Sequence, residues 1–266
     1  MRALIVVPTY NEIENLQSLI EAVLGATPGT VDLLVVDDNS PDGTGHLADL
    51  LSQKHEPRVH VLHRPKKMGL GTAYVNGFKW GLERKLGETP ERKLLEGTQG
   101  KADIGTAPAY DAIIEMDADF SHHPRYLKDM LATLETADVA IGSRYVPGGG
   151  TVNWGIGRKI LSRGGSLYSR LILGASIRDF TGGFNGWRRH VLESVDLPTL
   201  RSDGYSFQIE LKYRAFLKGF RLTEFPIVFE DRKVGKSKMS KRIVVEALKR
   251  VWGFRLNARK FLTHSG

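Results

Sequence analysis

Short apolar runs alternate with amphipathic stretches through the first half of the chain, and this alternation constrains the fold more than any other feature. Runs with the length of buried strands occur at residues 3–7, 31–36, 59–62, 112–116 and 139–141. Stretches with helical spacing of apolar residues lie at 44–54 and 71–85. Strands that alternate with helices predict an α/β fold with a mostly parallel sheet, covered by helices on both faces.

A further helix is predicted directly after the first strand. Asn11 is typical of an N-cap, and Glu14, three residues later, would complete a capping box. An apolar stripe at helical spacing follows, made of Ile13, Leu16, Leu19, Ile20 and Val23. We therefore expect a helix that begins just after Asn11.

The rest of the chain predicts one domain with an insertion. Residues 87–108 are rich in Gly, Thr, Glu and Lys and lack apolar periodicity, which indicates a surface insertion. After Gly148 the sequence changes to Gly, Arg and aromatic residues, and we interpret this half as completing the site. We predict a single domain over 1–256, which ends in amphipathic helices, and a tail at 257–266.

Composition excludes several classes of site. The 266 residues include no cysteine, so disulfides, thiolate catalysis and Cys-ligated metals are excluded, and a reducing, cytoplasmic setting is compatible with that. The formal charge of +8 favours anionic partners, such as nucleic acid, phosphorylated small molecules or an acidic membrane face. No apolar run approaches the roughly 20 residues that a spanning helix needs.

Two pairs of aspartates follow predicted strands. Asp117 and Asp119 come directly after the run at 112–116, where a parallel sheet binds its ligands. Two carboxylates there can bind Mg²⁺ or Mn²⁺, which also takes phosphate oxygens from a substrate, and the alternative is a solvated acidic turn. Asp37 and Asp38 end the second strand, where they either stabilise a turn or bind the N–H groups or ribose of a nucleoside.

Glycine motifs for common cofactors are absent. Gly69 and Gly71 precede a predicted helix, but the dinucleotide-binding pattern needs a third glycine where Tyr74 stands. The P-loop pattern is missing as well. These glycines therefore predict a tight turn.

Basic residues are concentrated in the second half. Arg144, Arg158 and Lys236–Lys238 lie in predicted Gly-bearing loops, where arginine suits bidentate phosphate binding, although solvated surface is the usual role of such residues. Two stretches, 160–173 and 243–256, mix apolar and basic residues, and the second contains Trp252. Such stretches suit either a membrane interface or ordinary packing on the core.

Taken together, these residues resemble the family 2 inverting glycosyltransferases with a Rossmann-like GT-A fold. The resemblance rests on residues 6–12, 36–44, 116–119 and 142–145. Residues 121–124, 158–164, 179–184 and 231–238 are similar, more narrowly, to the dolichol- or polyprenol-phosphate mannose synthases. The insertion at 87–108 is a departure from that pattern.

The resemblance implies a role for individual residues. Those expected to hold the nucleotide of GDP-mannose are Pro8, Tyr10, Glu12, Asp37, Asp38 and Asp117. Asp117 and Asp119 are expected to bind Mg²⁺ or Mn²⁺, with Ser121 where some relatives have a third ligand, Gln. Arg144, Arg158, Arg232 and Lys238 are expected to bind the acceptor phosphate, and Asp119, Arg144 and Arg232 to be catalytic.

The implied activity is transfer of mannose, with inversion, to a polyprenyl phosphate. Such an enzyme is expected on the cytoplasmic face of a membrane, attached through the two amphipathic stretches or through a separate anchoring subunit. The alternative donors are UDP-glucose or another nucleotide sugar. A basic nucleic-acid-binding protein is disfavoured, because the strand ends are acidic and no helix-turn-helix, RRM or KH signature occurs. A non-catalytic nucleotide-binding regulator is disfavoured by the presence of Asp117, Asp119 and Arg144.

Overall fold

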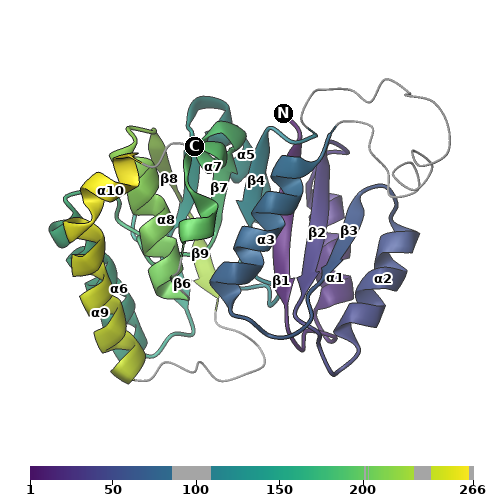
Figure 1. Ribbon diagram of the computed structural model, residues 1–266. Helices are drawn as coiled ribbons and strands as arrows, with labels where there is room; N and C mark the ends of the chain where they lie inside the picture. Colours follow the sequence, from purple (N-terminus) through teal and green to yellow (C-terminus); the bar gives the residue numbers. More distant parts are fainter. Residues whose placement is uncertain (86–108, 201, 203, 231–240, 264–266) are drawn as a thin grey trace.

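A seven-stranded sheet forms the centre of the protein, in the order β3-β2-β1-β4-β7-β5-β8 (Figure 1). The computed structural model describes residues 1–85, 109–200, 202, 204–230 and 241–263. The strands of this sheet are β1 (Ala3–Thr9), β2 (Val31–Asp37), β3 (Val59–His63), β4 (Ala112–Glu115), β5 (Val139–Ser143), β7 (Asn185–Arg188) and β8 (Leu222–Pro226). β6 (Gly150–Val152) and β9 (Val228–Glu230) form a small second sheet.

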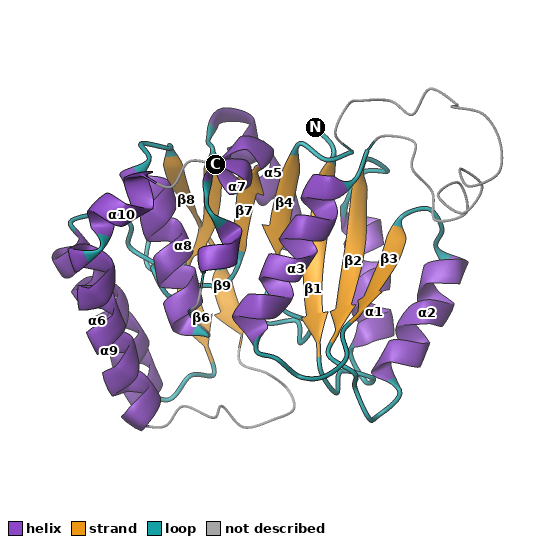
Figure 2. Cartoon of the chain, in the orientation of Figure 1, coloured by secondary structure: helices purple, strands orange, loops and turns teal. Residues whose placement is uncertain are grey.

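The large sheet is parallel except at β7. The pairs β1–β2, β1–β4, β2–β3 and β5–β8 are parallel, whereas β7 runs antiparallel between β4 and β5. The carboxyl ends of β1, β2 and β4 therefore lie at one edge of the sheet, which is the lower edge in Figure 2. This confirms the predicted α/β class and a mostly parallel sheet.

Helices cover both faces of the sheet. One apolar core contains residues from α3 (Leu70–Glu83), α6 (Ile156–Leu173), α7 (Arg189–Ser194), α8 (Tyr205–Leu217) and α9 (Lys241–Leu256). The other contains residues from α1 (Leu16–Ala26), α2 (Thr44–Lys54) and α5 (Leu127–Thr136). Alternate residues of β1 belong to opposite cores, with Leu4 in the first and Ile5 in the second, because successive side chains of a strand point to opposite faces. Short 3₁₀ turns lie at Pro124–Tyr126 and Leu197–Thr199.

The predicted start of the first helix is wrong. α1 begins at Leu16, with Asn15 at the N-cap, and Asn11 has a left-handed backbone with φ of 62°. The Asn11 backbone N–H donates to Ser40 Oγ (3.1 Å), and that of Glu12 donates to Thr44 Oγ1 (3.0 Å). These bonds to the loop after β2 hold the segment outside the helix, so Ile13 is exposed and a capping box at Asn11 and Glu14 does not form.

The second half contains elements that the apolar pattern did not predict. They are the strands β6 to β9, which are three to five residues long, the helices α7 and α8, and helix α10 (Ala258–Thr263) in the region predicted as a tail. Phe261 of α10 packs against the first core. Arg158, predicted in a loop, lies in the first turn of α6. The glycine turn is confirmed, since Gly69 has φ of 99° and caps α3.

Candidate active site

Polar loops meet where β1, β2 and β4 end. Thr9 of β1 lies beside Asp37 of β2 in register, and its hydroxyl donates to Asp37 Oδ1 (3.0 Å). The backbone N–H of Asp38 donates to the carbonyl of Thr9 (3.1 Å), and that of Met116 donates to the carbonyl of Val6 (3.1 Å). The structure therefore brings the two predicted aspartate pairs to the same edge of the sheet.

The turn after β4 holds Asp117 and Asp119 in a defined conformation. Asp117 Oδ1 accepts from the hydroxyl of Tyr74 (3.1 Å), and its backbone N–H donates to His122 Nδ1 (3.0 Å). Asp119 Oδ1 accepts from the backbone N–H of Ser121 (3.0 Å). Phe120, directly after Asp119, has a left-handed backbone with φ of 61°, which is costly for a bulky residue and is common at functional sites.

Burial keeps Tyr74 a hydrogen-bond donor. The side chain is fully buried, and burial together with the nearby charge of Asp117 raises the pKa of its phenol well above 10. The phenol therefore stays protonated and directs its O–H at Asp117. The side chain of Asp117 remains 27% exposed, so its carboxylate is open to a ligand.

The two aspartates fit a hard divalent cation. Their donors are carboxylate oxygens on one half-buried turn, which Mg²⁺ and Mn²⁺ prefer. In the described part of the chain, no group of three or more His, Asp or Glu side chains could hold a metal ion. Two carboxylates leave coordination positions for phosphate oxygens and water, which is the usual arrangement for such a cation on a phosphorylated substrate.

The second aspartate pair is held by different partners. Asp37 is buried, and its carboxylate also accepts from the backbone N–H (3.1 Å) and the hydroxyl (2.6 Å) of Ser40. Asp38 forms a buried ion pair with Arg64 (2.9 Å) and accepts from the backbone N–H of Met68 (3.2 Å). Burial raises the pKa of Asp38 in spite of these two contacts. Asp37 therefore stabilises the turn, whereas Asp38 connects this turn to the loop before α3.

The other predicted nucleotide residues line the same loops. Pro8 and Tyr10 are half-buried at the end of β1, and the ammonium of Lys67 lies 3.9 Å from the centre of the Tyr10 ring. Glu12 Oε2 accepts from the side-chain amide of Asn15 (3.0 Å). These residues lie in the segment at and after the end of β1, which bonds to the residues that follow Asp37 and Asp38.

Arg144 is held by a buried carboxylate at the end of β5. Its Nε and Nη2 donate to both oxygens of Asp179 (2.7 and 2.6 Å), and Nη2 also donates to Thr181 Oγ1 (2.9 Å). Burial alone would raise the pKa of Asp179, but pairing with Arg144 outweighs it and the pKa is lowered. Because a bidentate pair fixes the plane of the guanidinium, Asp179 orients Arg144.

A buried lysine shapes the loop that carries Asp179. The ammonium of Lys212, on α8, donates to the backbone carbonyls of Asp179 (3.0 Å), Phe180 (3.3 Å) and Gly182 (2.7 Å). Burial lowers its pKa to about 8. On β4, the carboxylate of Glu115 accepts from Asn185, Trp187 and Gln208, and burial raises its pKa to about 7. Helix α8 thus connects the strand before Asp117 to the loop that orients Arg144.

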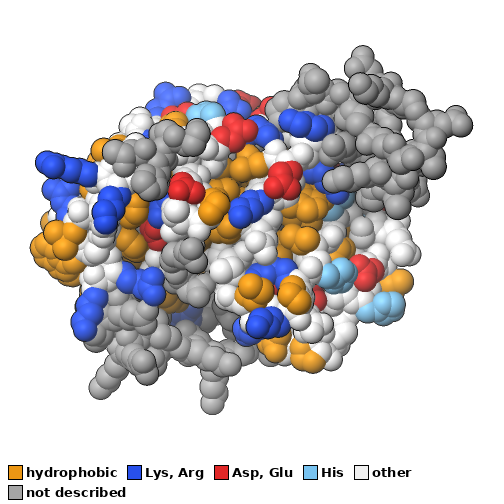
Figure 3. All heavy atoms as spheres, viewed as in Figure 1, with side chains coloured by type: hydrophobic (Ala, Val, Ile, Leu, Met, Phe, Trp, Pro, Cys, Tyr) orange, Lys and Arg blue, Asp and Glu red, His pale blue; other side chains and the backbone are white. Residues whose placement is uncertain are grey.

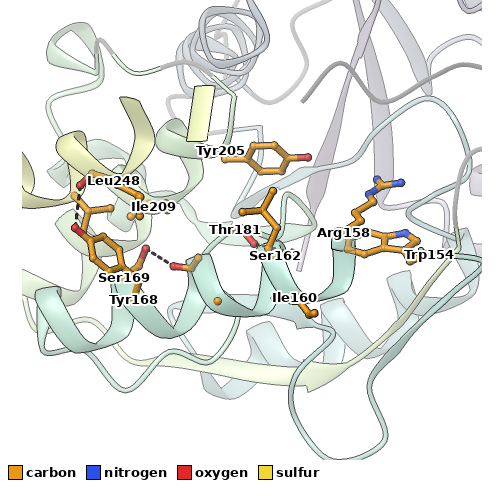
Figure 4. A pocket seen from close by; sticks show the side chains of 14 residues that line it. Trp154, Arg158, Ile160, Ser162, Tyr168, Ser169, Thr181, Tyr205, Ile209 and Leu248 are labelled. Carbon is orange, nitrogen blue, oxygen red and sulfur yellow. Dashed lines mark hydrogen bonds between the residues drawn. The ribbon is translucent and has the colours of Figure 1, made fainter. Parts of the chain in front are cut away.

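An apolar cavity of about 340 Å³ lies beside this loop, between α6, α8 and α9. Figure 4 places Arg158 and Trp154 at one end, Tyr168 and Leu248 at the other, and Tyr205 opposite α6. The guanidinium of Arg158 lies 4.0 Å from the centre of the Trp154 ring. The cavity therefore has a long apolar interior with a cation at one end.

Aromatic contacts connect the aspartate turn to the cavity. The ring of His122, which accepts from the Asp117 backbone, packs edge-on against Phe229 (centroids 5.6 Å apart). Phe229 packs edge-on against Trp154 (5.3 Å), which lines the cavity. Arg144 Nη2 reaches Thr181, which also lines it. Packed side chains thus connect the acidic turn and Arg144 to the wall of the cavity.

Two of the residues predicted to bind the acceptor phosphate, Arg232 and Lys238, lie outside the described residues. No role was predicted for Tyr74, Lys212 or Glu115, since each occurs in a stretch whose composition is that of ordinary core. None was predicted for Trp154 either, which lies in a glycine-rich stretch. A buried lysine in the apolar spacing of α8 was the available signal for a polar network.

The comparisons with known proteins decide the family. The sequence model described as "Glycosyl transferase family 2" matches residues 4–82 and 109–196, which include both aspartate pairs and Arg144. The chain belongs to glycosyltransferase family 2. This confirms the family and the prediction of an enzyme.

Two curated relatives of this glycosyltransferase match nearly its whole length. An undecaprenyl-phosphate mannosyltransferase of Micrococcus luteus is 45% identical, over 97% of this chain and 96% of the relative. A polyprenol monophosphomannose synthase of Mycolicibacterium smegmatis is 46% identical, over 96% of this chain and 88% of the relative. The more specific resemblance to polyprenol-phosphate mannose synthases is thereby confirmed.

Solved structures share the fold at low identity. The glucosyl-3-phosphoglycerate synthase of Mycobacterium tuberculosis, in complex with Mn²⁺, UDP-glucose and phosphoglyceric acid, superposes with a TM-score of 0.60. It is 18% identical over 97% of this chain and 79% of that chain. The same enzyme with phosphoglyceric acid alone gives 0.61 at 17% identity, over 95% of this chain and 80% of that one. This glycosyltransferase therefore has the GT-A fold of those enzymes.

Proposed function

We propose that this glycosyltransferase transfers mannose from GDP-mannose to a polyprenyl phosphate, with inversion and with a divalent cation. The observation that carries the proposal is that packed side chains join the acidic turn to the wall of the apolar cavity between α6, α8 and α9. A water-soluble anionic donor fits the turn, and an isoprenoid chain fits the cavity. The names of both relatives, a mannosyltransferase and a phosphomannose synthase of polyprenyl acceptors, support this choice.

The donor is expected at the ends of β1, β2 and β4. Pro8, Tyr10, Glu12, Asp37 and Asp38 line the loops where the guanosine would lie. Asp117 and Asp119 would hold Mg²⁺ or Mn²⁺ beside the diphosphate. A bound cation supplies a Lewis acid that stabilises the negative charge on the departing diphosphate.

The acceptor brings its own nucleophile. The phosphate monoester of a polyprenyl phosphate has a second pKa of about 6, so its oxygen is largely ionised at neutral pH. No strong general base is then required. The chemical difficulty is the repulsion between an anionic nucleophile and an anionic donor, which fixed cations reduce.

Arginines provide that charge. Arg158 lies at one end of the cavity, beside Trp154. If the hydrocarbon chain of the acceptor occupies the cavity, its phosphate would lie at this end. Arg144, oriented by Asp179, borders the same cavity through Thr181. Arg232 and Lys238 keep the phosphate-binding role that the sequence resemblance implies. In-line attack on the anomeric carbon from the side opposite the leaving GDP gives the inverted, β-linked product.

Membrane contact is proposed for the outer surface of α6 and α9. None of the described helices is long and apolar enough to cross a bilayer. Exposed apolar side chains gather on this edge, namely Ile156, Ile160, Leu167 and Leu171 on α6 and Trp252 and Leu256 on α9. Figure 3 shows apolar and basic side chains next to each other at the left edge of the molecule, where α6, α9 and α10 lie. Such a surface suits peripheral attachment to the anionic cytoplasmic face of a membrane.

The test is transfer of labelled mannose from GDP-mannose to polyprenyl phosphate with Mn²⁺, with UDP-glucose in parallel. Wild type is expected to form mannolipid, and Asp119→Asn to lose it. Turnover with UDP-glucose alone would reassign the donor. If no labelled lipid forms with either donor, both with and without membranes that could contain an anchoring subunit, the proposal is contradicted.

A further inference from the structure

Two adjacent glycines interrupt the longest described helix of the protein. Gly164 and Gly165 stand in the interior of α6, which runs from Ile156 to Leu173. Glycine destabilises a helix interior relative to alanine, because it loses more backbone freedom on folding. Two in succession therefore need a reason.

Packing within the protein explains the glycines at 77 and 81 of α3 but not these two. In α3 a Cβ at Gly77 would lie 2.4 Å from Val6 Cγ1, and one at Gly81 would lie 2.8 Å from Leu4 Cδ2, so both positions need glycine. Among the described residues, a Cβ at Gly164 would meet nothing within 4 Å. At Gly165 the one described neighbour would be Thr181 Cγ2, at an ordinary contact distance of 3.9 Å. The described part of the protein therefore leaves room for a side chain at both positions.

Both glycines line the apolar cavity. Leu161 and Tyr168 line it one turn before and one turn after them, so the cavity wall at the glycines is bare helix backbone. Thr181, whose Cγ2 is the described atom nearest to a Cβ at Gly165, also lines the cavity. A side chain at Gly165 would therefore extend along the cavity wall and reduce the space available to an occupant.

We propose that Gly165, with Gly164, is a specificity-determining contact for the isoprenoid chain of the acceptor, and this inference rests on the function proposed above. The missing side chains let the chain lie directly against the backbone of α6. The occupant is identified by the two ends of the cavity: Arg158 at one end complements a phosphate, and the apolar interior toward Leu248 complements a hydrocarbon.

The experiment compares three variants of the full chain. Gly165→Leu fills the cavity, and Gly165→Ala narrows it by one methyl group. Gly253→Ala is the matched control, because Gly253 is a helical glycine of α9 with nothing within 4 Å of a Cβ, and it does not line this cavity. Melting temperatures are recorded for each, and both alanine variants are expected to gain about 2–4 °C.

Acceptor use is then measured in two ways, by the KM for polyprenyl phosphate in mannosyl transfer and by direct binding of a fluorescent isoprenyl phosphate without donor. Gly165→Leu is expected to weaken both roughly tenfold or more, since filling the pocket removes contacts of several methylene groups. Gly165→Ala is expected to weaken both by a smaller factor although the protein is more stable, with the KM for GDP-mannose unchanged. Gly253→Ala should match wild type.

The outcomes separate this inference from the function on which it rests. If wild type binds the isoprenyl phosphate and Gly165→Leu does not, the result supports the acceptor contact at Gly165, even if GDP-mannose proves to be the wrong donor. Undiminished binding and acceptor KM in a folded Gly165→Leu would overturn it, whether or not mannose is transferred. Failure of wild type to bind the isoprenyl phosphate would overturn both.

Discussion

The two ends of the site differ in polarity, one being lined by charged groups and the other by apolar ones. At the ends of β1, β2 and β4, carboxylates are held by hydrogen bonds from Ser40, Tyr74 and Ser121 and are arranged for a charged, water-soluble ligand. Between α6 and α9 the walls are apolar, and Arg158 supplies a cation at one end. The contrast indicates an enzyme that receives one substrate from water and the other from an apolar phase. Changes that affect one end and spare the other test this division.

The largest effect is expected where the two ends join, at the ion pair of Asp179 and Arg144. Asp179→Asn leaves a buried guanidinium without its counterion, which costs about 3–5 kcal/mol of unfolding free energy. Urea unfolding followed by circular dichroism measures it. The control is the ion pair of Arg189 and Glu193, in which the Glu193 side chain is 49% exposed, and Glu193→Gln should cost less than about 1 kcal/mol. Equal losses in the two variants would show that the buried pair has no special role.

The same pair predicts a direction of pH dependence. Since the folded pKa of Asp179 lies below its ordinary value of 3.8, its contribution to stability is complete above that pH. It is lost as the pH falls through the lower, folded-state pKa. Stability curves of wild type and Asp179→Asn should therefore run parallel above pH 3.8, and below it the curve of Asp179→Asn should fall less steeply. Identical slopes below pH 3.8 would contradict the prediction.

A large effect confined to the donor end is expected from Asp119→Asn. Removing one carboxylate charge from the cation site should lower mannosyl transfer roughly a hundredfold. Binding of a fluorescent isoprenyl phosphate and the unfolding free energy should change little, since Asp119 lies outside the cavity. If acceptor binding fell together with transfer, the division between the two ends would be wrong.

An intermediate effect, on membrane binding, is expected when two exposed residues of α6 are replaced together. Ile160 is 68% exposed and Leu171 is 71% exposed, so Ile160→Ser with Leu171→Ser should not disturb the core. Loss of apolar contact should weaken binding to phosphatidylglycerol vesicles roughly tenfold, as measured by co-sedimentation. Leu50→Ser, at an exposed position of α2, is the control and should bind as wild type does. Equal binding by all three proteins would place the membrane contact elsewhere.

The smallest effect is expected from Ser121→Ala, next to the cation site. The Ser121 hydroxyl is buried and makes no hydrogen bond to any described residue, so its removal should change the unfolding free energy by no more than about 0.5 kcal/mol. If two carboxylates suffice for the cation, the Mn²⁺ concentration for half-maximal transfer should also stay within about twofold. A much larger requirement for Mn²⁺ would identify Ser121 as a third ligand.

The sequence predicted the part of the fold that rests on strong local patterns. The runs at 3–7, 31–36 and 112–116 became β1, β2 and β4 within two residues at each end, because a strand buried on both faces is nearly all apolar. Their polar ends then placed Asp38 and Asp117 at one edge. The short strands β6 and β9 pair only with each other, and three residues carry too little periodicity to predict.

The unpredicted parts depend on long-range contacts. Asn11 has the composition of an N-cap, but hydrogen bonds to the loop after β2 hold its segment in another conformation. Lys212 donates to carbonyls that lie about thirty positions earlier in the chain, so no local pattern identifies its partners. The apolar cavity likewise forms only when α6, α8 and α9 pack together, although the sequence showed that 160–173 and 243–256 were amphipathic.

The measurement that tests the central claim most directly is a crystal structure with GDP-mannose, Mn²⁺ and a short polyprenyl phosphate analogue. The account predicts an anomalous manganese signal at Asp117 and Asp119, the acceptor phosphate at Arg158, and isoprenoid density against Gly165 between α6 and α9. Manganese bound away from the two aspartates, or a lipid chain that lies outside this cavity, would contradict it.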